Sequence, residues 1–144
     1  MTFAQLNTPL MMPAVRIHDL QPDRRVLAVD LRHVISVLGD RALLSFWRVR
    51  DVWATGDATE ELEALDEGAA ISGRRLLELS QRVVQIIDGV FSAFESDSPL
   101  PWVVVEARDS SFYAVHSDED SVLAAVRHSF HSVVSHEYPV TAPR

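Results

Sequence analysis

The chain has 144 residues, no cysteine and a formal net charge of −8 at pH 7. This length fits a single domain. The absence of cysteine excludes disulfides, zinc ribbons, iron–sulfur clusters and thiol catalysis. The negative charge repels nucleic acids and anionic membranes, and it would attract a basic protein.

Hydrophobic residues make up 47% of the chain and charged residues 24%, as in an average folded domain. No apolar run approaches the roughly 18 residues of a membrane span. The segment from Met1 to Met12 has no positive side chain ahead of its apolar stretch, unlike a signal peptide. We therefore expect a cytoplasmic protein that binds neither membranes nor nucleic acids.

The two ends of the chain carry weak structural signals. Residues 1–21 have no sustained period and contain Pro9 and Pro13, which predicts a loose N-terminal arm. A single folded domain is expected over residues 22–136. Residues 137–144 are expected to form a frayed tail.

The first two elements of this domain are predicted to be a helix and a strand. Residues 23–38 form the helix, with Pro22 before it and Gly39 after it. Its apolar stripe consists of Leu27, Leu31, Val34, Ile35 and Leu38. Residues 43–54 alternate and are rich in Val, Phe and Trp, which predicts a strand. Asp51 falls in phase with the apolar side of this strand, so it lies near the strand end or a bulge shifts the faces.

An acidic run, residues 57–67, then predicts a loop or a short solvated helical turn. Ser72 is a good N-cap for a helix over residues 73–88, which Gly89 would end. Asp88 would lie at the C-terminal end of this helix, where the helix dipole disfavours an acid. It therefore needs a partner such as an arginine or a backbone amide, or it is a functional carboxylate with a raised pKa.

Three short strands are predicted over residues 90–94, 102–108 and 112–116, with connections short enough for an antiparallel meander. Ser117 is expected to cap a last helix, whose apolar stripe runs to Val133. The order α-β-α-β-β-β-α fits an α+β two-layer sandwich. About four mostly antiparallel strands would carry three helices on one face.

The motifs for catalysis, metals and nucleotides are weak or missing. His128 and His131 share a helix at i,i+3 spacing, with His116 as the one further donor, and no carboxylate interleaves as in a zinc protease. The acidic run 57–67 lacks the ligand order of a calcium-binding loop. Asp109-Ser110-Ser111 is typical of a turn and not of a nucleophile elbow. We expect no cofactor, no metal and no catalytic residue.

The open face of the predicted sheet is the best candidate for a binding surface. Arginine and tryptophan, which are enriched at binding hot spots, occur together on its strands. The candidate binding residues are Trp47, Arg48, Arg50, Trp53, Asp88, Glu106 and Arg108. Cross-strand ion pairs and core tryptophans would explain the same pattern without a ligand.

Two functions of different class remain open. The first is a small acidic protein-interaction module, an immunity-type inhibitor or an accessory regulator, whose partner is a basic protein or a second copy at the open sheet face. The alternative is a small-molecule-binding protein or enzyme. Its pocket would lie between the sheet and the helix over residues 73–88, around Asp88, Glu106 and Arg108. We recognise no family pattern, so no activity is carried over by resemblance.

Overall fold

The computed structural model describes residues 10–21, 27–65 and 69–140. All its strand pairs are antiparallel, and they form one seven-stranded sheet in the order β3-β2-β4-β5-β6-β1-β7. The strands are β1 (Leu10–Ile17), β2 (Phe46–Gly56), β3 (Ala70–Ser72), β4 (Val83–Phe94), β5 (Val103–Arg108), β6 (Phe112–His116) and β7 (Val133–Val140). The helices are α2 (Leu31–Leu38), α3 (Asp40–Leu44), α4 (Thr59–Ala64), α5 (Gly73–Gln81) and α6 (Asp120–Ser129).

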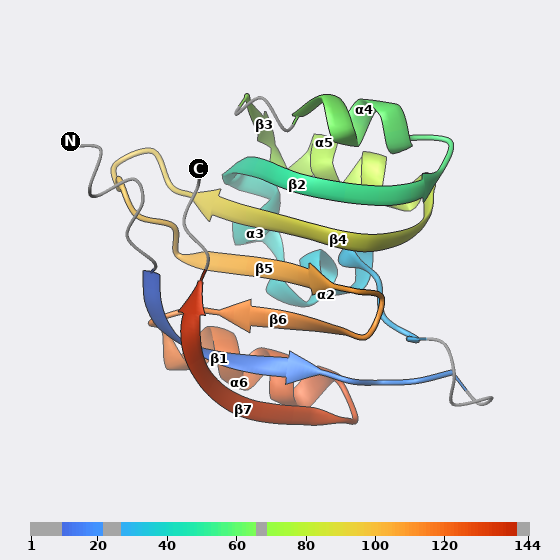
Figure 1. Ribbon diagram of the computed structural model, residues 1–144. Coiled ribbons are helices and arrows are strands. Elements are labelled where there is room, and N and C mark those ends of the chain that lie inside the picture. The colour runs from blue at the N-terminus through green and yellow to red at the C-terminus, as the bar shows by residue number, and fades with distance from the viewer. Residues whose placement is uncertain (1–9, 22–26, 66–68, 141–144) are drawn as a thin grey trace.

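The helices lie on one side of the sheet and leave the other face open (Figure 1). The core fills the space between the two layers. Its largest fully buried side chains include Trp47, Phe91, Ile35, Leu62 and Leu76. The predicted α+β class with helices on one face is confirmed, but the sheet has seven strands where about four were predicted.

The additional strands come mainly from the two ends of the chain. The predicted loose arm contributes β1, which lies between β6 and β7, and the predicted tail contributes the second half of β7. Alternation in LMMPAVRI is interrupted by Pro13, and β7 contains Pro139, so neither segment resembles a strand in isolation. Residues 1–9 and 141–144 of the predicted arm and tail lie outside the described residues.

The helix predicted over residues 23–38 is shorter in the structure. Asp30 is the N-cap of α2, and its backbone N–H donates to His33 Nδ1 at 2.9 Å. Leu27, predicted to lie in the helix, instead forms an isolated bridge with Leu20. Gly39 ends α2 as predicted, with a positive φ of 79°. Pro22 and the residues up to 26 lie outside the described part of the chain.

The helix predicted over residues 73–88 ends early. Ser72 is its N-cap, as predicted, and accepts a hydrogen bond from the Arg75 backbone N–H at 3.1 Å. α5 stops at Gln81, and β4 begins at Val83, so Asp88 lies inside a strand and not at a helix end. The β-branched residues that follow Arg82 continue the helical spacing by coincidence, but they favour a strand.

The remaining elements follow the predictions more closely. β4, β5 and β6 form the predicted antiparallel meander. The acidic run contains the short helix α4, while α3 and β3 were not predicted. The N-cap of α6 is Glu119 and not Ser117, whose hydroxyl donates to the Trp102 carbonyl at 2.7 Å. Among the described helices, none is long and apolar enough to cross a membrane.

Candidate functional site

Two irregularities in neighbouring strands determine which side chains reach the open face. Asp51 has a positive φ of 56°, and the β2–β4 register shifts between Arg50 and Trp53. Trp47 and Val49 point into the core before this bulge, whereas Val52 and Ala54 do so after it. Trp53 is thereby turned outward. This confirms the bulge that the position of Asp51 suggested.

A second register shift realigns β4 with β2. Trp53 pairs with Asp88, whereas the next residue, Ala54, pairs with Ile86. Directly opposed residues of an antiparallel pair project to the same side. Trp53 and Asp88 therefore stand together on the open face.

The structure places most of the predicted binding residues on this one face. They come from three neighbouring strands and are Arg48, Arg50, Trp53, Asp88, Glu106 and Arg108. Trp47 is not among them, which corrects the prediction. It is fully buried on the helix side of the sheet, and its Nε1 donates to the Ala42 carbonyl at 2.8 Å.

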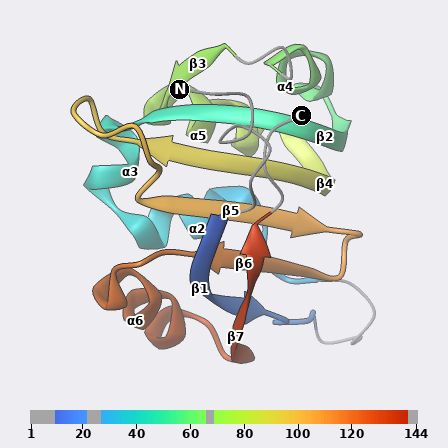
Figure 2. The ribbon, with the colours of Figure 1, turned by 60° about the vertical axis from the view of Figure 1, so that its left-hand side comes forward.

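Glu106 lies at the centre of a buried polar cluster on the open face. Its side chain and that of His116 are completely buried. His116 Nε2 lies 3.0 Å from Glu106 Oε1, and the Arg108 guanidinium donates to the other carboxylate oxygen. The outer ends of β1 and β7 cross in front of this part of the sheet (Figures 1 and 2). Glu106 and His116 are closed to solvent, whereas the Arg108 side chain is 39% exposed.

Two opposing influences set the pKa of Glu106. Burial raises the pKa of Glu106, but the neighbouring His116 and Arg108 together lower it more strongly. The pKa of Glu106 consequently lies below its ordinary value of 4.5. The carboxylate is thus the favoured form in the folded protein.

The lowered pKa of Glu106 predicts a pH dependence of stability. A carboxyl group whose pKa is lower in the folded state stabilises the protein fully above its unfolded-state pKa, and this contribution is lost as the pH falls through the folded-state pKa. Below about pH 4.5, the wild type should lose free energy of unfolding more steeply than Glu106→Gln. Urea denaturation from neutral pH down to about pH 3 measures this difference. Parallel pH profiles for the two proteins would contradict the assignment.

Asp88 has a structural partner from the neighbouring turn. Its Oδ1 accepts the Asp109 backbone N–H at 2.9 Å, which is the backbone-amide interpretation of this residue. Asp109 and Ser110 have positive φ values of 53° and 57°, and the Ser110 N–H donates to the Ile87 carbonyl at 3.0 Å. The predicted turn at 109–111 is therefore held against β4 by Asp88 and its neighbour.

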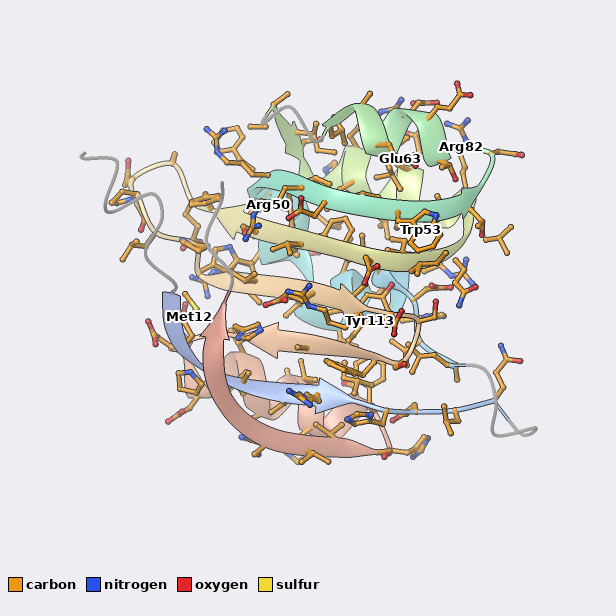
Figure 3. All side chains as sticks on the ribbon, viewed as in Figure 1. Met12, Arg50, Trp53, Glu63, Arg82 and Tyr113 are labelled. Atoms are coloured by element: carbon orange, nitrogen blue, oxygen red, sulfur yellow. The ribbon has the colours of Figure 1, made fainter. Side chains whose placement is uncertain are left out.

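Trp53 is 58% exposed, the largest exposure among the aromatic residues whose burial the structure describes. Figure 3 shows it standing out from β2, with Arg50 further along the same strand and Glu63 on α4 toward the Trp53 end. Arg50 is tied to Asp51 at 3.1 Å, as Arg108 is to Glu106. The exposed acids at this end that have no basic partner in the described chain are Asp57, Glu60, Glu63 and Asp109.

A separate cavity of about 250 Å³ lies at the opposite end of the sheet, and the sequence did not predict it. The Arg41 guanidinium lies over the Trp102 ring, 4.1 Å from its centroid. Glu95 and Glu119 bind this guanidinium at 2.7 Å and 2.9 Å and raise the pKa of Arg41. These residues are far apart in sequence, so no local motif predicts the cavity.

The three histidines considered as metal ligands, His116, His128 and His131, do not come together in the structure. His128 and His131 are exposed, while His116 is buried against Glu106. Within residues 10–21, 27–65 and 69–140, no three side chains of the ligating types converge to hold a metal ion.

Comparisons of the chain with protein-family models, with curated proteins and with solved structures found no match.

Proposed function

We propose that this protein is a non-enzymatic interaction module, of the inhibitor or accessory-regulator kind, which binds a partner protein through the open sheet face around Trp53. The exposed indole carries this proposal. Tryptophan is highly buried on average, yet a bulge at Asp51 turns this one toward solvent. Tryptophan is also the residue type most enriched among binding hot spots, together with tyrosine and arginine.

The titratable groups of this face favour binding over catalysis. Glu106 and His116 are fully buried and contact each other, and Asp88 holds a turn. A general base must reach the proton that it abstracts. The alternative, a small-molecule site around Asp88, Glu106 and Arg108, would have to lie on the open face, because these side chains project away from α5.

The proposal is tested by recovering the partner from cells in which the protein occurs. Tagged wild type and Trp53→Ala would be purified in parallel, with quantification of every co-purified protein by mass spectrometry. Loss of a hot-spot tryptophan should lower the affinity for a specific partner by about 30-fold, which corresponds to about 2 kcal/mol of binding free energy. Recovery of that partner with Trp53→Ala should fall accordingly. Leu100→Ala is the matched control, because Leu100 is 60% exposed and lies in the β4–β5 loop, at the other end of the sheet. If Trp53→Ala and Leu100→Ala both recover every protein in the same amount as the wild type, the proposal is contradicted.

A further inference from the structure

The Trp53 end of the open face combines an indole with carboxylates. Trp53 and Asp88 are directly opposed on β2 and β4, a spacing of about 5 Å between Cβ atoms. Asp88 is half-buried, and Oδ1 accepts the Asp109 N–H. Its second carboxylate oxygen makes no hydrogen bond or ion pair with any described residue. An aromatic ring and an acidic oxygen are thus presented side by side on an unpartnered sheet face.

The charges around this pair that lack a partner of opposite sign in the described chain are all acidic. Glu60 and Glu63 on α4, Asp57 before it and Asp109 beside Asp88 are exposed and have no basic partner in the described chain. Glu61 differs from them, because Arg75 and Arg82 bind it at 2.7 Å and 3.3 Å. Acids therefore outnumber bases at this end of the face, where Arg50 and Arg108 are already bound to Asp51 and Glu106, and an occupant meets a net negative field.

We infer that this surface takes a cationic side chain, arginine or lysine, from a basic partner protein, which packs on the Trp53 ring beside Asp88. The inference rests on the proposed function and names the chemistry of the partner. A cation over an indole is attracted by the negative face of the ring, and the surrounding acids steer a basic surface toward it. The chain contains the same combination internally, where Arg41 lies on Trp102 between Glu95 and Glu119.

Charge also distinguishes this occupant from a second copy of the chain. Each copy carries a net charge of −8, and this end of the face is itself acidic. At physiological salt, charges interact strongly within about 8 Å, so the acids nearest Trp53 decide which surface is accepted. A basic surface gains from them, whereas another copy of the same acidic end is repelled.

The experiment uses the full chain and a peptide of alternating arginine and glycine, with a glutamate–glycine peptide for comparison. Calorimetric titration would be run at about 50 mM and about 300 mM salt. The arginine peptide should bind the wild type and the glutamate peptide should not. Trp53→Ala should weaken arginine-peptide binding about fivefold, with a comparable loss in Asp88→Asn. The asparagine can still accept the Asp109 N–H, so the turn is retained.

Asp97→Asn is the control that matches Asp88→Asn in charge. Asp97 is exposed in the β4–β5 connection, at the other end of the sheet. Equal weakening by the two asparagine variants would mean attraction by net charge alone and would overturn the inference. A peptide affinity unchanged in Trp53→Ala would do the same.

Two further results separate this inference from the proposed function. A partner that needs Trp53 but binds through an acidic or neutral surface would contradict this inference. The proposed function as an interaction module would still hold. Analytical ultracentrifugation of the chain alone tests the second copy. A dimer that Trp53→Ala dissociates would replace the basic partner as the occupant, whereas a monomer that binds the arginine peptide supports the inference.

Discussion

Gly73→Ala is expected to destabilise this protein by about 3 kcal/mol or more and to leave little folded chain. A Cβ at position 73 would lie 1.8 Å from the Ala42 carbonyl oxygen and 2.8 Å from the Leu43 Cα. Both are backbone atoms, so no side-chain rotation relieves the clash. The Gly73 N–H also donates to the Ser45 carbonyl at 3.0 Å, which joins the start of α5 to the end of α3. Urea denaturation followed by circular dichroism measures the loss.

Gly39→Ala provides a matched control for this experiment. Gly39 has a positive φ of 79°, but a Cβ there would meet nothing within 4 Å. With ψ at −158°, Gly39 lies in a backbone region that is essentially confined to glycine. The substitution should therefore cost backbone strain alone, about 1–3 kcal/mol and less than Gly73→Ala. Similar losses for the two variants would show that α3 and α5 do not pack as closely as Gly73 implies.

Glu106→Ala is expected to cost about 3 kcal/mol, the loss typical of removing one partner from a buried charge network. The substitution leaves His116 fully buried without its carboxylate and removes the partner of Arg108. The substitution also frees the Arg108 guanidinium on the same face as Trp53 and Asp88, so arginine-peptide affinity of the folded fraction should fall. Chemical denaturation at neutral pH gives the stability, and the peptide titration gives the affinity.

The stability cost of Glu106→Ala can be compared with that of two other variants. Glu78→Ala removes an exposed ion pair with Arg75 and should cost about 0.5 kcal/mol. The double substitution Glu106→Leu with His116→Leu should be more stable than Glu106→Ala, because it removes both buried polar side chains of the pair together and fills their space with apolar atoms. A cost for Glu106→Ala no larger than that of Glu78→Ala would contradict the buried network.

The candidate face was largely predictable because alternation in a strand is a local property. The period of two placed Arg48 and Arg50 on one side of β2, and Glu106 and Arg108 on one side of β5. Asp51 interrupted the alternation and thereby indicated the bulge that exposes Trp53. Trp47 was placed wrongly in the binding set, because its large ring suits a hot spot and a core equally well.

Other features depended on contacts between distant segments. β1 and β7 contain proline and little alternation, and they become strands because they pair with each other and, through β1, with β6. The burial of Glu106 and His116 likewise has no signal in the local sequence of β5 and β6. Asp88 was predicted to lie at a helix end, because Val83 and Ile87 continue the apolar spacing of the preceding helix. The same residues are equally compatible with a strand, which is what they form.

The sequence by itself determined the class of the fold, the central meander, the caps at Gly39 and Ser72, and the shared side of the sheet for Arg48 and Arg50 and for Glu106 and Arg108. These properties follow from backbone preference and side-chain period, which act over a few neighbouring residues. Tertiary structure alone decided that the terminal segments join the sheet, that Glu106 is buried with His116, and that Trp53 stands beside Asp88 among unpaired acids. These properties arise from pairing between segments far apart in the chain, and local chemistry does not encode which segments will meet.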